Sequence, residues 1–198
     1  MKKSLRRQIR SSITRPHSDL SSYNRPRQMI ELCNAIARAA NIEKAATLVD
    51  PRIIVNTVKD CEARLASEII NSYGEVYKKC GQIVDALMNF PSIFKGSKLD
   101  QFAPSTASNW PTGQYSPYRF RQLVAELGIV GRVRHKETHS GVIAADFEYF
   151  MKGRLPITSS DECVIHPMFY QRLNVRVDPA YRIYPFPDHP DYNDIYRY

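Results

Sequence analysis

Two acidic residues in this sequence have a spacing that could support metal-dependent hydrolysis. Asp146 and Glu148 lie two residues apart in an alternating segment, so both would project from one face of a strand, where paired carboxylates can hold a divalent cation. His135 and His139 lie four residues apart, the spacing that aligns two metal ligands on a helix. A solvated strand face accounts for the carboxylates without any ligand, and the histidines straddle a predicted hairpin tip where they need not converge. We predict no metal site and no cofactor, and a metal-dependent nuclease is retained as the second alternative.

No other arrangement of residues predicts catalysis. A nucleotide-binding loop needs a glycine-rich turn followed by Lys and Ser or Thr, and Gly96-Ser97-Lys98 is too short a fragment of that pattern. No grouping of serine, cysteine and histidine indicates nucleophilic catalysis. We predict that the chain is not an enzyme.

Basic residues suggest binding instead. Arg119 and Arg121 fall on the non-apolar side of a predicted helix, and the segment that follows alternates basic with other residues through Arg132, Arg134 and Lys136. Such residues would present positive charge to a groove and to its flanking phosphates. They are the predicted nucleic-acid-binding residues, and duplex DNA is the predicted ligand.

The elements that would position these residues follow in a recognisable order. Ser116 and Pro117 are typical of a helix start, and Gly128 can end that helix in the left-handed conformation. Two alternating segments then predict a hairpin, with Ile143, Ala145, Phe147 and Tyr149 on one face. A short strand and a short helix follow from Glu162 to Tyr170. This order predicts a winged helix-turn-helix with a β-hairpin wing.

Helical patterns precede it. The first predicted helix has an apolar face that comprises Met29, Leu32, Cys33, Ile36, Ala37 and Ala40. A second helix is predicted from about Pro51 to Ser72, and the apolar residues from Val76 to Met88 predict the face of a third. The predicted fold class is mainly α (α+β), an N-terminal helical bundle followed by the winged helix. The predicted parts are a basic arm (1–24), a helical lid-like bundle (25–90), the winged-helix domain (91–177, including a loop at 103–115) and an extended tail (178–198).

The tail is rich in proline and tyrosine. Proline at that density argues against a regular helix or a sheet ladder, and the aromatic side chains favour contact with the domain or a partner. The predicted partner-binding residues are Trp110, Tyr184, Tyr192 and Tyr196. Trp110 could instead anchor its own loop.

Composition limits the class of protein. The 198 residues are 43% hydrophobic and 24% charged, which is typical of a folded domain, and a net charge of +8 favours a polyanionic partner. Residues 1–27 contain eight Lys or Arg and one acid. The four cysteines lack metal-ligand spacing, which favours buried free thiols in a reducing compartment. With neither a signal peptide nor a membrane span in the sequence, we expect a cytoplasmic protein.

Two sets of motifs resemble a known class. The run from Arg25 to Asn34 resembles the start of the helical lid in bacterial P-loop ATPases of the STAND and origin-recognition types, and 127–133, 147–149 and 164–174 resemble the winged helix that closes those proteins. The nucleotide-binding core of that class is missing here. The resemblance implies a lid-plus-winged-helix piece that works with a partner P-loop ATPase core, with Arg25 or Arg27 near the nucleotide, in a setting such as anti-phage defence.

The resulting expectation is a non-catalytic winged-helix subunit that binds nucleic acid, a partner P-loop ATPase, or both. The first alternative is a purely protein-binding adaptor of a larger complex.

Overall fold

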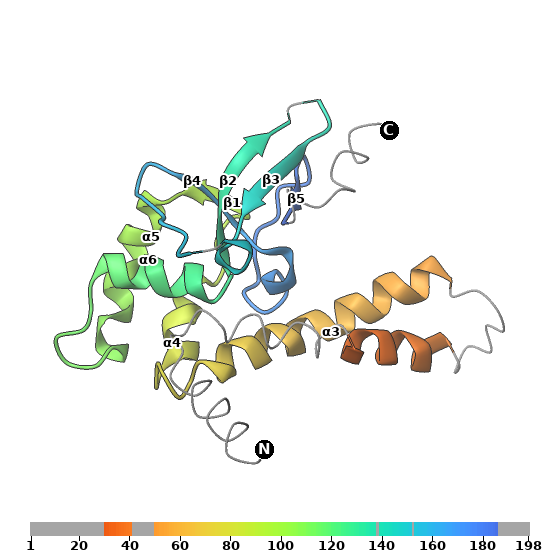
Figure 1. Ribbon diagram of the computed structural model, residues 1–198, viewed down its shortest axis with the longest axis horizontal. Coiled ribbons are helices and arrows are strands. Elements are labelled where there is room, and N and C mark those ends of the chain that lie inside the picture. The colour runs from red at the N-terminus through yellow and green to blue at the C-terminus, as the bar shows by residue number, and fades with distance from the viewer. Residues whose placement is uncertain (1–29, 41–49, 138, 152, 186–198) are drawn as a thin grey trace, which may run out of the picture.

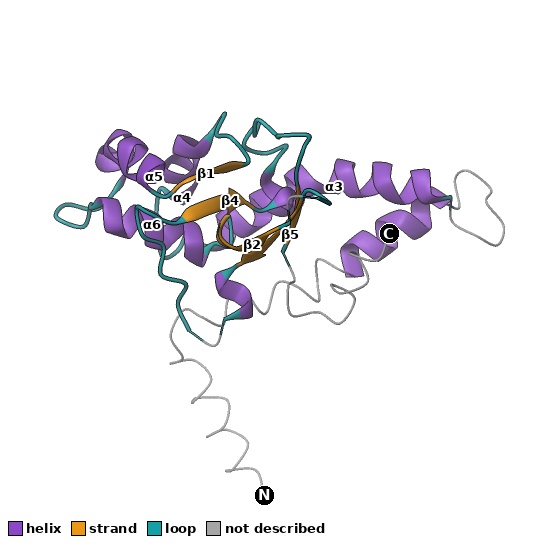
Figure 2. Cartoon of the chain, turned by 90° about the horizontal axis from the view of Figure 1, so that it is seen from above, coloured by secondary structure: helices purple, strands orange, loops and turns teal. Residues whose placement is uncertain are grey.

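A computed structural model describes residues 30–40, 50–137, 139–151 and 153–185. Its longest element is α3 (Pro51–Ser72), which begins where the sequence predicts: the Asp50 carboxylate accepts a hydrogen bond from the backbone N–H of Arg52 at 2.8 Å, and Pro51 occupies the first turn. Residues 30–40 form a helix that lies alongside α3 (Figures 1 and 2). Arg64 of α3 joins the two through an ion pair with Glu31 at 2.9 Å.

This pair of helices projects beyond the rest of the molecule (Figures 1 and 2). The C-terminal half of α3 carries Leu65, Ala66 and Ile70 into the core, where Tyr73 follows at the C-cap, whereas the N-terminal half lies over helix 30–40. We call residues 30–40 and 50–64 the helical arm.

Short elements follow α3 and surround the core. They are α4 (Cys80–Val84), the 3-10 turn η2 (Asp85–Leu87), β1 (Ile93–Lys95), α5 (Ser97–Phe102), the 3-10 segment η3 (Ala103–Asn109) and α6 (Pro117–Glu126). Helix α6 is capped as predicted, since the Ser116 hydroxyl accepts a hydrogen bond from the Arg119 N–H at 3.1 Å. Gly128, just past its end, has a φ of +69°, which confirms the predicted left-handed stop.

Five strands form one sheet in the order β1-β4-β2-β3-β5. The strands that follow α6 are β2 (Val130–Lys136), β3 (Val142–Asp146), β4 (Glu162–Ile165) and β5 (Arg182–Tyr184), with 3-10 turns η4 (Glu148–Phe150) and η5 (Pro167–Phe169) between them. All neighbouring strands are antiparallel except β3 and β5, which are parallel. The predicted hairpin, β2–β3, is therefore the middle of a sheet, with β4 on one side and β5 on the other.

The sheet is packed on both faces. On one face Val130, Cys163 and Ile165 join the apolar residues of α3, α4, α5 and α6 in the main core. On the other face Ile143, Ala145, Phe147 and Val164 form a smaller cluster with Tyr149 and Tyr181 against it. The predicted alternation of 143, 145, 147 and 149 is confirmed, because all four side chains belong to this second cluster.

The predicted fold class is wrong. Of the described residues, 48% are helical and 17% are in strands, and the curled five-stranded mixed sheet forms a half-barrel in a mixed α/β fold, in place of a helical bundle followed by a winged helix. The winged-helix interpretation failed because β1 and β5 were not recognised as strands, and they extend the hairpin into a sheet. A wing would have an exposed face, but every residue of β3 is buried.

Two smaller predictions also failed. The third helix is much shorter than the apolar periodicity suggests, because only Cys80–Val84 is α-helical before η2. The proline-rich tail does contain a sheet ladder, since Pro179 and Pro185 flank a run without proline that pairs with β3. Proline is compatible with a short edge strand when it lies outside the paired residues.

Candidate functional site

The five predicted nucleic-acid-binding residues lie on two elements, α6 and β2. The structure shows how far each one is available to a ligand, because an arginine already held by a carboxylate has little charge to offer a phosphate.

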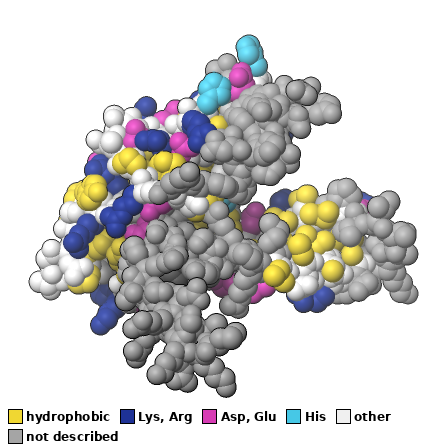
Figure 3. Space-filling view, in the orientation of Figure 1, with side chains coloured by type: hydrophobic (Ala, Val, Ile, Leu, Met, Phe, Trp, Pro, Cys, Tyr) yellow, Lys and Arg dark blue, Asp and Glu magenta, His cyan; other side chains and the backbone are white. Residues whose placement is uncertain are grey.

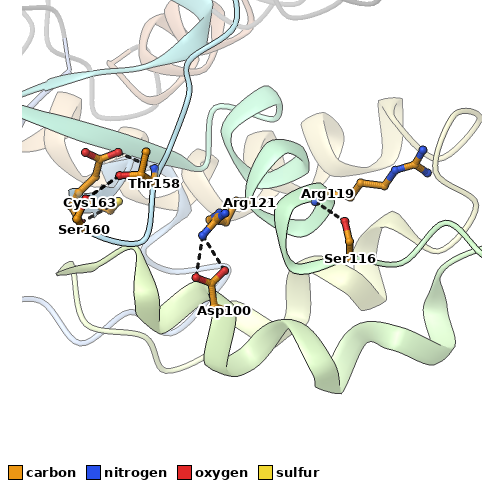
Figure 4. Close-up of polar contacts among 8 residues, drawn as sticks. Asp100, Ser116, Arg119, Arg121, Thr158, Ser160 and Cys163 are labelled. Carbon is orange, nitrogen blue, oxygen red and sulfur yellow. Dashed lines mark hydrogen bonds and ion pairs between the residues drawn. The ribbon is translucent and has the colours of Figure 1, made fainter.

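Arg121 does not lie on an exposed side of α6. One terminal nitrogen of its guanidinium donates hydrogen bonds to both carboxylate oxygens of Asp100, at 2.9 and 2.7 Å, and only 17% of the side chain is exposed (Figure 4). Asp100 lies on α5, which packs against this side of α6. Arg121 therefore links two helices of the fold.

Arg132 and Arg134 share one acidic partner, Asp146. The Arg134 Nε donates to an Asp146 oxygen at 2.7 Å, and the Arg132 guanidinium lies 3.8 Å from the other oxygen. Arg132 pairs with Asp146 across β2 and β3, and the register shifts between Val133 and His135, so Arg134 lies at a β-bulge. Two residues of β2 thereby reach the same carboxylate.

Lys136 lies against the other face of the sheet. Its ammonium is 4.0 Å from the ring centroid of Tyr181 and 3.9 Å from a Glu162 carboxylate oxygen. The contact with Tyr181 is close enough for a cation–π interaction. Lys136 thus connects β2 to the segment that leads into β5.

Arg119 is the exception among the five. It is exposed, its guanidinium donates a 3.4 Å hydrogen bond to the amide oxygen of Gln114, and the side chain points away from the Arg121–Asp100 pair (Figure 4). Within the described ranges it makes no ion pair with an acid. Among the described residues, Arg119 is therefore the one member of the predicted set without an acidic partner.

The predicted partner-binding residues have different positions. Trp110 is buried, packs edge-on against Tyr77 and donates from its indole nitrogen to the Thr106 hydroxyl at 2.9 Å. Trp110 therefore anchors its own loop, which is the alternative that the sequence left open beside partner binding. Tyr184 is half-buried in β5. Tyr192, Tyr196, Arg25 and Arg27 lie outside the described residues.

The residues of the nuclease alternative do not converge. Asp146 is 8% exposed and is held by the two arginines of β2, so it is not part of a solvated strand face. Glu148 lies beyond the end of β3, where its carboxylate accepts a hydrogen bond from the Leu155 N–H at 3.3 Å. His135 and His139 are exposed at the hairpin tip. In the part of the chain that the structure describes, no group of three or more His, Cys, Asp or Glu side chains could hold a metal ion.

One polar cluster has no counterpart in the sequence-based predictions. The hydroxyls of Tyr73 and Tyr77 donate to the backbone carbonyl and the carboxylate of Glu126, each at 3.4 Å. Burial, followed by the charge of Glu126, raises the pKa of Tyr77 to about 12 and that of Cys80 to about 12. These groups are protonated at neutral pH, so they are suited to hydrogen bonds that stabilise the fold and not to action as nucleophiles. The four-residue spacing of Tyr73 and Tyr77 was its only sequence signal.

A second feature that sequence reasoning missed is the outer surface of the helical arm. The apolar periodicity predicts that Cys33 and Ala37 lie on the buried face of their helix, but both are exposed, as is Ile30, which is 61% exposed. Hydrophobic side chains gather on the side of the arm turned toward the viewer in Figure 3. The signal was present in the sequence, because eight of residues 30–40 are apolar and one packed face cannot hold them all.

The excess positive charge of the protein lies mainly outside the described residues. The described residues contain 17 Lys or Arg and 15 Asp or Glu, a net charge of +2, whereas residues 1–29 contain eight basic residues and one acid. None of the helices that the structure describes is long and apolar enough to cross a membrane. No protein family, curated protein or solved structure matches this chain.

Proposed function

We propose that this chain is a non-catalytic nucleic-acid-binding protein whose phosphate contacts come chiefly from the basic segment 1–27. The observation that carries the proposal is the unequal distribution of charge between that segment and the described residues. Eight basic residues against one acid in 27 residues make a strongly cationic segment, while the described residues are close to neutral.

The ion pairs of the folded body support the same assignment. Arg121, Arg132, Arg134 and Lys136 all have acidic neighbours within 4 Å, which partly neutralise them. A phosphate that approached these residues would have to displace a carboxylate. Asp19 is the one acid within the segment 1–27, so few carboxylates of the segment itself compete with the phosphates of a nucleic acid for its eight basic residues.

The chemistry of the buried nucleophiles favours binding over catalysis. Burial raises the pKa of the Cys80 and Cys163 thiols to about 12, which keeps both in the unreactive protonated form. Asp146, one of the two carboxylates of the nuclease alternative, is paired with two arginines.

The test is a salt titration of binding to a short duplex of random sequence, followed by fluorescence anisotropy. A first variant replaces five basic residues of the segment with glutamine: Lys2, Lys3, Arg6, Arg7 and Arg10. A matched control replaces five exposed basic residues of the folded body: Lys59, Lys78, Lys79, Lys95 and Arg182. Both variants lose the same charge, so they differ only in where the charge is lost.

We expect the wild-type affinity to fall on the order of 100-fold or more between about 50 and 200 mM salt, and the slope to decrease by about 0.9 for each phosphate contact that is removed. The segment variant should lose most of this slope, and the control variant should keep it. Equal losses in the two variants would place the binding surface on the folded body, and no binding at low salt would refute the proposal.

A further inference from the structure

The outer surface of the helical arm carries an apolar stripe that the other described residues leave exposed. Ile30, Cys33 and Ala37 recur at three- and four-residue steps on helix 30–40 and are all exposed, while Leu32 and Ile36 are half-buried. Asn34 and Arg38 lie on the same exposed side, but eight of the eleven residues are apolar, and apolar residues on more than one side of a helix are typical of a bundle. The arm supplies only one of the two neighbours that such a helix needs.

We propose that the arms of two copies of this chain pack against each other through this stripe, forming a four-helix bundle about a twofold axis. Two hairpins that meet face to face give the usual four-helix arrangement, and a twofold interface requires a surface that is complementary to itself. Because the arm projects beyond the sheet and the other described helices, these elements do not obstruct a second copy (Figures 1 and 2).

The order of side chains along the stripe is self-complementary in shape. With the two helices antiparallel and the axis between Cys33 and Asn34, the large side chain of Ile30 faces the small side chain of Ala37 of the other copy. The same contact occurs twice, once on each side of the axis. Cys33 lies beside the axis, where its small side chain allows the two helices to approach closely.

The charges of the arm are also compatible with a second copy. Residues 30–40 and 50–64 contain four acids and four basic residues, so two arms do not repel each other through net charge. Arg38 is the charged residue on the exposed side of the helix, and antiparallel packing separates the two copies of Arg38 by about 13 Å along the axis. The basic segment 1–27 is a poor match for the same stripe, because Arg38 would repel it.

The first experiment measures the mass of the full-length protein by light scattering at increasing concentration. We expect the mass to rise from that of a 22.8 kDa monomer to twice this value at about 100 µM. Ala37→Arg should weaken dimerisation at least about 100-fold, since it places two like charges in the interface. Ala37 is exposed, so the variant should retain the wild-type circular dichroism spectrum and melting temperature.

Gln101→Arg is the matched control, because Gln101 is exposed on α5 and the variant adds the same charge away from the arm. It should dimerise like the wild type. A wild-type protein that stays monomeric throughout the concentration range, or a dimer that Ala37→Arg leaves intact, would overturn the proposal.

Thiol labelling gives a second readout at the proposed axis. Cys33 is exposed, whereas Cys61, Cys80 and Cys163 are buried, so Cys33 should react first with a maleimide. We expect its labelling rate to fall as the protein concentration rises in the wild type, and to stay constant in Ala37→Arg. A rate independent of concentration in a dimeric wild type would place the interface elsewhere. This result is independent of the nucleic-acid proposal, which is tested by salt dependence.

Discussion

The carboxylate of Asp100 on α5 receives two hydrogen bonds from one guanidinium nitrogen of Arg121 on α6, and 21 residues of chain separate the two. The pair holds the two helices together on the side of α6 that the sequence suggested was free for a ligand. The Arg121–Asp100 ion pair therefore stabilises the fold, and substitution of Arg121 can test this role.

Arg121→Ala should lower the free energy of unfolding by about 1–2 kcal/mol, because it removes a partly buried ion pair and leaves Asp100 without its donor. Urea denaturation measures the change. Arg119→Ala is the control: the Arg119 side chain is exposed, and its substitution should alter stability by less than about 0.5 kcal/mol. Equal effects of the two substitutions would contradict the structural role of Arg121.

Asp146→Ala should destabilise the protein by about 2 kcal/mol, since two arginines of β2 lose their shared acceptor in a buried part of the sheet. Asp60→Ala, an exposed acid on α3, provides the control and should be nearly neutral. Thermal and urea unfolding give the comparison. A metal-dependent nuclease activity in the wild type that disappears in a fully stable Asp146→Ala protein would support the nuclease alternative instead.

Gly131→Ala should cost about 1–3 kcal/mol through overpacking. A Cβ at this position of β2 would lie 2.7 Å from the Phe147 ring and 2.8 Å from the backbone oxygen of Asp146. Gly153→Ala adds the same atom where nothing lies within 4 Å, so it isolates the effect of the clash. If the two variants unfold at the same urea concentration, the result would contradict the close contact between Gly131 of β2 and the Phe147 ring.

Glu148 should make stability depend on pH. Burial, and then the charge of Glu126, raise its pKa above the ordinary value of 4.5, so the folded state favours the protonated carboxyl. The stability that this group contributes is present below the unfolded pKa and is lost as the pH rises through the folded pKa. Glu148→Gln keeps an oxygen for the Leu155 N–H but cannot ionise.

The stability of Glu148→Gln relative to the wild type should therefore increase as the pH rises from about 4 to about 7. Urea unfolding across this range measures the difference. A difference that stays constant with pH would show that Glu148 titrates alike in the folded and unfolded chains.

Local signals in the sequence identified several elements correctly. The bounds of α3 follow from the Asp50-Pro51 start and the apolar repeat, and those of α6 from the Ser116 cap and Gly128. The alternation of Ile143, Ala145 and Phe147 likewise predicted which side chains of β3 share a face. Each of these features depends on neighbours within a few residues, and such neighbours are visible in the sequence.

What the sequence determined by itself was therefore local: where α3 and α6 begin and end, the alternation of β3, and the concentration of basic residues in 1–27. Only the tertiary structure decided that β1 and β5 complete a sheet around the hairpin, and that Arg121, Arg132, Arg134 and Lys136 are occupied by acids. The physical reason is distance along the chain. Asp100 and Glu162 meet their basic partners only after the helices and strands pack, and no local pattern of charge records which carboxylate will arrive.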